Sequence, residues 1–205
     1  MAQQKDVPLA HYSAAFRKLV PESAIERTGI PFDGTLQRFT VDVSGHLLYA
    51  QWPEFKLLPD DAGACPKTLY GFQMQVLTMR FLLEGAYVPP TGVFKAYREL
   101  PWGDVYDANF RGNCIRRLAS GFGNRPDVFA KAAAALGGIR REAGDISYDL
   151  PFMGGVVCRL ILWGADDEFP PSAQFLFSDN TPAAFNAEDL AVVGDVIIRA
   201  LTEVI

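Results

Sequence analysis

Two alternating segments joined by a tight turn restrict the fold more than any other feature of the sequence. In residues 36–43 apolar side chains alternate with polar ones, and after Ser44-Gly45 the alternation continues through residues 46–52. This period of two is typical of strands with one buried face, and a two-residue link makes the strands antiparallel neighbours. The sequence therefore predicts a β-hairpin near the N-terminus.

The spacing of apolar residues predicts helices elsewhere. Helical periodicity indicates helices over residues 9–19 and 69–83, and two more are predicted over residues 106–120 and 127–136. The predicted buried stripe of the second helix consists of Leu69, Phe72, Val76, Met79 and Leu83. The middle of the chain is therefore predicted to be helical.

A final helix is predicted near the C-terminus. Asn186 can cap this helix, and Glu188 and Asp189 lie in its first turn, where negative charge is favourable. The predicted buried stripe of this helix consists of Leu190, Val193, Ile197 and Leu201.

Two further runs, residues 146–150 and 156–163, are predicted to be strands. Both are rich in β-branched or large apolar residues and are bounded by glycine and proline. Helices and strands do not alternate as they do in βαβ units, so the predicted fold class is α+β, a mostly antiparallel sheet packed with several helices. A chain of 205 residues can bury a core of its own, so one domain over residues 1–205 is expected.

The charge balance disfavours a nucleic-acid partner. The chain has 24 acidic and 19 basic residues, a formal net charge of -5, and no basic cluster, so it would repel a phosphate backbone. No segment approaches the roughly 20 apolar residues of a membrane span, and the N-terminus lacks the apolar run of a signal peptide. We therefore expect a cytoplasmic protein with no membrane partner.

The cysteines and histidines do not have the spacing of common metal sites. Cys65, Cys114 and Cys158 include no Cys-x-x-Cys pair, which argues against a structural zinc or an iron–sulfur cluster and favours buried, reduced thiols. His11 and His46 are the only histidines, and neither has an evident nucleophile partner for a catalytic triad.

Three adjacent carboxylates follow the second predicted strand. Asp166, Asp167 and Glu168 precede Phe169 and two prolines, which stiffen the chain. A hard cation such as magnesium or calcium would offset the repulsion between the carboxylates. In the alternative interpretation, two of them face water and one caps the following segment. Under the first interpretation Asp167, Glu168 and Phe169 are candidate ligand-binding residues.

A second polar and aromatic cluster surrounds the turn at residues 101–104. Arg98 and Glu99 precede this turn and Tyr106 follows it. A guanidinium beside a carboxylate is either an ion pair that fastens the turn or a clamp for a substrate. Asp145 precedes a predicted strand. If these segments meet the three carboxylates in space, one pocket would carry both signs of charge, and Arg98, Glu99, Tyr106 and Asp145 would bind ligand.

Several blocks of the sequence together resemble one prokaryotic family. The blocks are ERTGIPFD, TGVFKAYRELPWGDVY, LGGIRREAGDISYDLPF, ILWGADDEFPPSAQFLF and AEDLAVVGDVII. Their order and spacing are similar to those of the domain of unknown function 3786 family. This resemblance implies an anaerobic bacterial or archaeal origin. Some family members are joined to a cysteine-rich iron–sulfur domain like that of corrinoid proteins, which this sequence does not contain, and the family carries no established activity.

Two classes of function are compatible with these observations. The first is a small-molecule-binding or accessory protein, linked to tetrapyrrole, corrinoid or iron–sulfur metabolism, in which some of the 15 Phe, 7 Tyr and 3 Trp line an apolar pocket. The second is a carboxylate-based, divalent-metal-dependent enzyme that uses Asp167 or Glu168 with Arg98 nearby. A small-molecule ligand is the expected partner, and a protein partner is also compatible with the sequence. The sequence assigns no cofactor and no catalytic residue.

Overall fold

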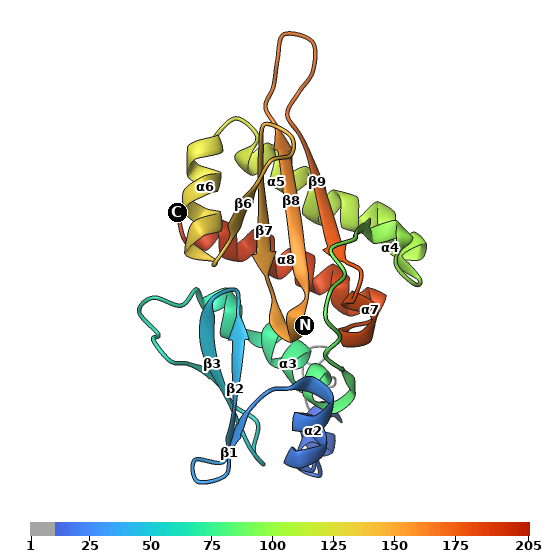
Figure 1. The fold of residues 1–205 in the computed structure, drawn as a ribbon. Coiled ribbons are helices and arrows are strands. Elements are labelled where there is room, and N and C mark those ends of the chain that lie inside the picture. Colours follow the sequence, from blue (N-terminus) through green and yellow to red (C-terminus); the bar gives the residue numbers. More distant parts are fainter. Residues whose placement is uncertain (1–10) are drawn as a thin grey trace, which may run out of the picture.

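A computed structural model describes residues 11–205 as two antiparallel sheets with helices around them (Figure 1). The N-terminal sheet has four strands and the second sheet has five. Every strand pair in the described residues is antiparallel. The predicted α+β class is therefore confirmed, with two sheets. Residues 11–16 are helical, as predicted, and the start of the predicted 9–19 helix lies outside the described residues.

The predicted hairpin forms the centre of the N-terminal sheet. In chain and spatial order, its strands are β1 (Phe32–Asp33), β2 (Arg38–Val43), β3 (His46–Gln51) and β4 (Leu57–Pro59). Ser44 and Gly45 have φ angles of 53° and 76°, and positive φ at both turn residues matches the twist of the flanking strands. The Ser44 hydroxyl also donates to the carbonyl of Pro151, at 3.0 Å, which joins this turn to the second sheet.

The second sheet contains both of the later strands that the sequence predicted. Across the sheet, the strands are β5 (Phe94–Ala96), β9 (Ser172–Ser178), β8 (Val157–Trp163), β7 (Ile146–Pro151) and β6 (Ile139–Arg141). Strand β9 was not predicted from the sequence. The short run Phe175-Leu176-Phe177 after Pro170-Pro171 was a signal for this strand, and Phe175 and Phe177 are buried.

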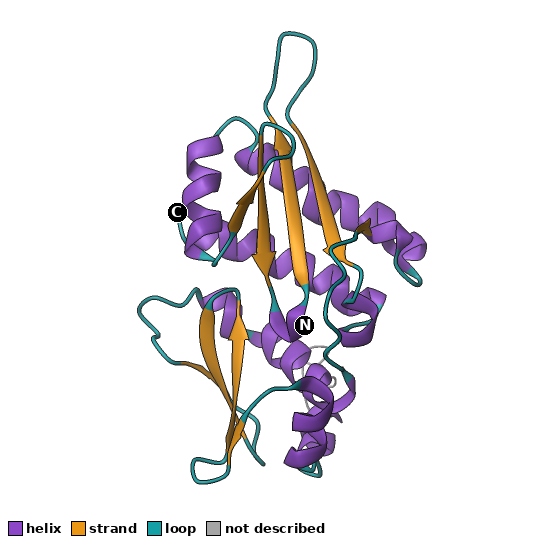
Figure 2. Ribbon diagram, viewed as in Figure 1, coloured by secondary structure: helices purple, strands orange, loops and turns teal. Residues whose placement is uncertain are grey.

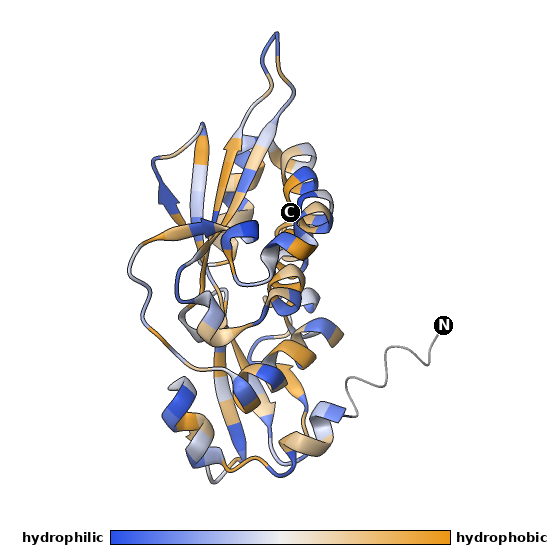
Figure 3. Ribbon diagram, turned by 90° about the vertical axis from the view of Figure 1, so that its right-hand side faces the viewer, coloured by the Kyte–Doolittle hydropathy of each residue, from blue (hydrophilic) through white to orange (hydrophobic). Residues whose placement is uncertain are grey.

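Helices cover one face of the five-stranded sheet (Figures 1 and 2). Among them, α5 (Arg116–Phe122) contacts β8 and β9, and α6 (Pro126–Ala135) contacts β7. The other helices of the described residues are α2 (Pro21–Thr28), α3 (Phe72–Glu84), α4 (Gly103–Phe110), α7 (Thr181–Ala184) and α8 (Ala187–Glu203). Figure 3 shows the helices behind one side of this sheet, with the opposite side left to strands and loops. In residues 11–205, no helix has the length and apolar character to cross a membrane.

The C-terminal helix α8 matches the sequence prediction closely. The side chain of Asn186 accepts a hydrogen bond from the backbone N–H of Asp189 at 2.9 Å, so it caps the helix as predicted. The predicted stripe is buried, with exposures of 1% or less for Leu190, Val193, Ile197 and Leu201.

Helix α3 was predicted, and its buried face was predicted in part, because Met79 of the predicted stripe is fully buried. Phe72, assigned to the buried stripe, is 38% exposed, whereas Met74, Leu77 and Phe81 are fully buried. The helix contacts both α2 and α8, so the directions of these neighbours decide which side chains are buried. Periodicity predicts that a helix has a buried face, but it does not say which neighbours that face meets.

Candidate functional site

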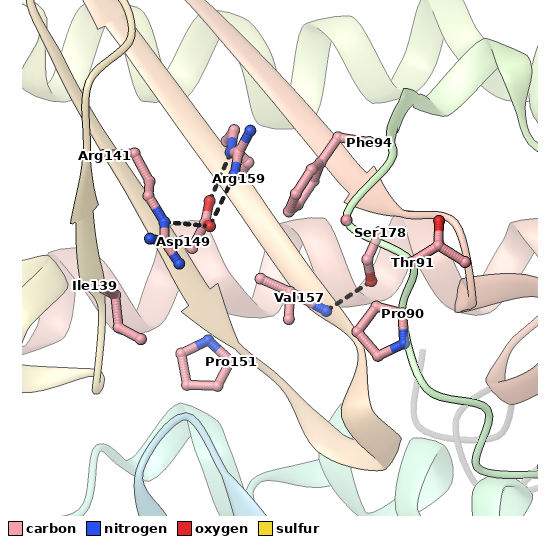
Figure 4. Close-up of a pocket in the computed structure, with 11 residues that line it drawn as sticks. Pro90, Thr91, Phe94, Ile139, Arg141, Asp149, Pro151, Val157, Arg159 and Ser178 are labelled. Carbon is pink, nitrogen blue, oxygen red and sulfur yellow. Dashed lines mark hydrogen bonds and ion pairs between the residues drawn. The ribbon is translucent and has the colours of Figure 1, made fainter.

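A pocket of about 420 Å³ lies on the face of the five-stranded sheet opposite the helices (Figure 4). Its floor is formed by side chains of β7 and β8, and residues 90–94 form one wall. Figure 4 shows that the charged side chains Arg141, Asp149 and Arg159 gather on one side of the pocket, and that Ser178 and Thr91 lie on the other. The apolar lining residues include Phe94, Ile139, Pro151 and Val157.

Strand register places the charged residues of the pocket on this open face. Asp149 of β7 lies opposite Arg159 of β8 and opposite Ile139 of β6. Directly opposite residues project from the same face of a sheet, and their chain neighbours project from the other face. Accordingly, Tyr148 points to the helices and packs against Phe129 of α6, with ring centroids 5.6 Å apart.

Two arginines hold the carboxylate of Asp149. The oxygens of Asp149 accept hydrogen bonds from Nε of Arg159 at 2.7 Å, from Nη2 of Arg159 at 2.9 Å and from Nε of Arg141 at 2.7 Å. Each guanidinium carries five N–H donors, so both retain donors that Asp149 does not use. Two positive charges and one negative charge leave this group, which we call the arginine cluster, with a net positive charge.

The ionised state of Asp149 is favoured despite its burial. Burial is the largest single influence and raises the pKa of Asp149, but hydrogen bonds from Arg159 and Arg141, with the positive charges of both, together hold that pKa below its usual value. The hydrogen bond to Asp149 in turn raises the pKa of Arg159. The arginine cluster therefore keeps its net positive charge at neutral pH.

The wall at residues 90–94 helps to fix the position of Arg159. The ring of Phe94 lies 3.8 Å from Cζ of Arg159, which is a cation–π contact. Phe94 is held there because it pairs with Ser178 across the sheet, and Thr91 donates its backbone N–H to the carboxylate of Asp179 at 3.0 Å. The guanidinium of Arg159 is therefore pre-positioned by a carboxylate and by an aromatic ring.

The three adjacent carboxylates lie in the long loop between β8 and β9, which projects beyond the end of the sheet (Figure 1). Asp166 Oδ1 accepts hydrogen bonds from the backbone N–H groups of Glu168 and Phe169, at 2.9 and 2.7 Å. Asp167 and Glu168 are exposed, and the Phe169 side chain is 65% exposed. Asp166 thus caps the loop, whereas the predicted ligand-binding residues Asp167, Glu168 and Phe169 face outward.

The base of this acidic loop, residues 164–171, meets one other predicted residue. Asp145 Oδ2 accepts a hydrogen bond from the N–H of Gly164 at 2.8 Å. On the other side, Oδ1 of Asn124 accepts from the N–H of Ala165 at 3.1 Å. Asp145 and the acidic loop therefore do come together, through a contact with the backbone.

The cluster around Arg98 is fastened by different contacts from those expected. The carboxylate of Glu99 accepts a hydrogen bond from the backbone N–H of Ala96 at 2.6 Å. Tyr106 donates its hydroxyl hydrogen to Glu188 at 3.1 Å, and Arg98 is exposed. Glu99 therefore stabilises the helical turn at Tyr97–Glu99 through the backbone, not through the predicted ion pair with Arg98.

The two predicted clusters do not share one pocket. The chain is helical from Gly103 to Phe122, because a π-helical turn joins α4 to α5. Tyr106 lies near the first end of this helix, and Asn124, which contacts the acidic loop, follows the other end. At a rise of about 1.5 Å per residue, these ends are separated by roughly 25 Å. The predicted pocket that combines Arg98 with the acidic loop is not formed.

Comparison with known families supports the resemblance seen in the sequence. The family model described as Domain of unknown function (DUF3786) matches residues 20–200. The chain belongs to this family. No curated protein and no solved structure matches the chain. All of the residues that line the pocket of this DUF3786 protein lie within the matched region.

The arginine cluster of this DUF3786 protein was not predicted from the sequence. Arg159 is a single charge within an otherwise apolar strand, and Asp149 is a single carboxylate in the neighbouring strand. An unpaired charge is costly to bury, so an isolated charged residue in such a strand signals a partner. That signal was present in the sequence, but the identity of the partner depends on strand register.

The three cysteines have the buried surroundings that the sequence predicted. All three are free and buried. Burial raises the pKa of Cys65 to about 11 and that of Cys114 to about 12, and it raises the pKa of Cys158 well above its usual value. Residues 11–205 contain no cluster of three or more His, Cys, Asp or Glu side chains arranged to hold a metal ion.

Proposed function

We propose that this DUF3786 protein binds a small molecule with a carboxylate and an apolar body in the pocket above β7 and β8. The observation that carries this proposal is the arginine cluster, in which Asp149 positions two guanidinium groups at the edge of an apolar pocket. Arginine binds carboxylates well because its planar fork of donors can make two parallel hydrogen bonds.

The other properties of the pocket support the same ligand class. Its volume of about 420 Å³ lies within the usual range for small-molecule sites, roughly 300–1,000 Å³. The apolar walls formed by Phe94, Ile139 and Val157 suit an apolar ligand body, and the net positive charge of the arginine cluster favours an anion. The pocket therefore combines a few fixed polar groups with a mainly apolar lining.

Binding is better supported than catalysis at this site. Asp149 is ionised and engaged by both arginines, so it is poorly suited to accept a proton from a substrate. The alternative, a divalent-metal-dependent enzyme based on Asp167 or Glu168, stays a prediction. An accessory role beside a partner protein, a cytoplasmic location and an anaerobic source also stay predictions.

Tetrapyrroles and corrinoid precursors form one subclass of the proposed ligands, because they join carboxylate side chains to a large, mainly apolar ring. Titration with protoporphyrin, followed by its visible absorbance, tests this subclass. A shift in the absorbance band that saturates at one equivalent, and that is lost in Arg159→Gln, is the expected result. If protoporphyrin does not bind while simpler carboxylates do, the tetrapyrrole assignment is wrong.

Calorimetric titration with octanoate tests the general proposal. We expect octanoate to bind and octanamide, which has the same length and no charge, to bind much more weakly. Arg159→Gln should weaken octanoate binding about tenfold or more, because a charge-assisted hydrogen bond contributes roughly 1.5–3 kcal/mol. Thermal unfolding of each variant checks that the fold is retained.

Arg140→Gln is the matched control for this experiment. Arg140 precedes Arg141 in β6 and projects from the opposite face of the strand, so its replacement changes the net charge equally without touching the pocket. Octanoate affinity should be unchanged in Arg140→Gln. Equal binding of octanoate and octanamide, or equal losses in Arg140→Gln and Arg159→Gln, would contradict the proposed function.

A further inference from the structure

A second pocket lies beside the first and shares a residue with it. This second pocket has a volume of about 410 Å³, and its lining includes Ile30, Asp42, Tyr87 and Phe152. Pro151 lines both pockets. The two cavities are therefore neighbours, one on each side of Pro151.

The same two chain segments border both pockets. The β7–β8 hairpin contributes Asp149 and Arg159 to the first pocket, and its connecting residues 152–155 contribute to the second. The segment at residues 87–94 contributes Tyr87 to the second pocket and its later residues to the first. Because the two pockets share Pro151 and both bordering segments, we refer to them as the two lobes of one groove.

Contacts at the centre of the groove hold its parts together. The hydroxyl of Ser44 donates to the carbonyl of Pro151 at 3.0 Å, which places the β2–β3 hairpin, and with it Asp42, beside the second lobe. The side chain of Asn180 donates to the carbonyls of Val88 and Gly155, at 2.7 and 3.0 Å, and so joins the segment at residues 87–94 to the hairpin connection. Both borders are thus fastened by specific hydrogen bonds.

The two lobes carry opposite charges. The first lobe contains the arginine cluster, with its net positive charge. Asp42 is the charged residue that lines the second lobe, and its Oδ1 accepts a hydrogen bond from the N–H of Gly45 at 3.0 Å. A molecule that lies along the groove therefore meets a positive group at one end and a carboxylate at the other.

We infer that the groove binds an elongated zwitterion, with a carboxylate at Arg141 and Arg159, a protonated amine at Asp42 and an apolar chain across Pro151. This inference rests on the proposed function and extends it to the second lobe. Asp149 and Pro151 are two residues apart in β7, or about 7 Å. If the second lobe extends equally far beyond Pro151, the charged ends of the ligand are on the order of 14 Å apart.

Chain-length and charge series test this inference by calorimetry at low salt. The probes are aminoundecanoate, which carries a terminal amine and approaches the required length, undecanoate, which lacks the amine, and the shorter pair aminohexanoate and hexanoate. We expect aminoundecanoate to bind about three- to fivefold more tightly than undecanoate, as for a partly exposed ion pair. Aminohexanoate should gain nothing over hexanoate, because its amine does not reach Asp42.

The variant Asp42→Asn should remove the advantage of aminoundecanoate and leave undecanoate binding unchanged. Asparagine keeps an oxygen that can accept from Gly45, so the hairpin turn is retained. Asp33→Asn is the matched control, because Asp33 also accepts backbone hydrogen bonds in a turn of the same sheet but does not line the groove. The advantage of aminoundecanoate should persist in Asp33→Asn.

The outcomes separate this inference from the proposed function. Equal affinities of wild type for aminoundecanoate and undecanoate, or an advantage that survives in Asp42→Asn, would overturn the two-lobe inference. If undecanoate binding in the same experiment still depends on Arg159, the proposed function stands without the two-lobe inference. If undecanoate binding does not depend on Arg159, both are overturned.

Discussion

Asp149 and Arg159 lie opposite one another on neighbouring strands, and the carboxylate of Asp149 accepts two hydrogen bonds from that guanidinium, at 2.7 and 2.9 Å. Asp149 is only 5% exposed, so its charge depends on the arginines for compensation. The same pair therefore serves the fold, as a bridge between β7 and β8, and the pocket, as its fixed source of positive charge.

Replacing Asp149 by Asn should destabilise the fold. The variant leaves the guanidinium groups of Arg141 and Arg159 close together without their shared counter-charge, and we expect the free energy of unfolding to fall by about 2–4 kcal/mol. Urea unfolding measures this loss. Asp167→Asn, at an exposed position, is the matched control and should change stability by less than about 0.5 kcal/mol. Similar values for the two variants would show that the Asp149 bridge does not stabilise the fold.

The stabilising effect of Asp149 should depend on pH. Because the pKa of Asp149 is lower in the folded protein than in the unfolded chain, its contribution is present above the ordinary Asp pKa of about 3.9 and is lost as pH falls through the lowered value. Burial raises the pKa of Asp189, so Asp189 acts in the opposite direction. The stability difference between wild type and Asp149→Asn isolates Asp149, and it should shrink as pH falls below about 4. A constant difference over that range would contradict this assignment.

Within the acidic loop, the three carboxylates should contribute differently to stability. Asp166 accepts two backbone hydrogen bonds, so Asp166→Ala should cost about 1 kcal/mol. Asp167→Asn and Glu168→Gln should leave stability unchanged or slightly higher, because they relieve repulsion between adjacent charges. Thermal unfolding of the three variants measures these effects. A clear loss in Asp167→Asn or Glu168→Gln would assign these side chains a structural role.

The buried stripe of α8 provides a test of the core. Leu201 is fully buried, and Leu201→Ala should lower the free energy of unfolding by about 2–5 kcal/mol through lost contacts and a residual cavity. Leu47→Ala is the control, because Leu47 is 45% exposed in β3 and the same atoms are removed. Comparable losses in the two variants, measured by urea unfolding, would contradict the buried position of Leu201.

We propose that residues 1–205 fold as a single domain. Buried side chains from both sheets, including Val41, Leu48, Leu160 and Phe175, belong to one continuous hydrophobic cluster. Unfolding should therefore be cooperative, with far-UV circular dichroism and tryptophan fluorescence giving the same midpoint. Two separated transitions, one for each sheet, would show that the sheets belong to independent units.

Local patterns in the sequence were sufficient to predict several elements of the fold. The β2–β3 hairpin follows from alternation around Ser44-Gly45, and α8 follows from its cap at Asn186 and its regular apolar stripe. Each depends on residues close together in the chain, and α8 was predicted with its buried face. The acidic loop was also located correctly, because a stiff polar segment between apolar runs leaves the sheet wherever the strands lie.

Contacts between residues far apart in the chain decided the features that the sequence did not predict. The buried face of α3 depends on where α2 and α8 pack, and the pairing of Asp149 with Arg159 depends on the register of β7 against β8. A shift of one residue in that register would turn one of the two side chains to the helical face. The sequence by itself therefore determined the elements and the charges available to them, whereas only the tertiary structure decided that these two charges meet, because strand pairing brings together residues that no local pattern connects.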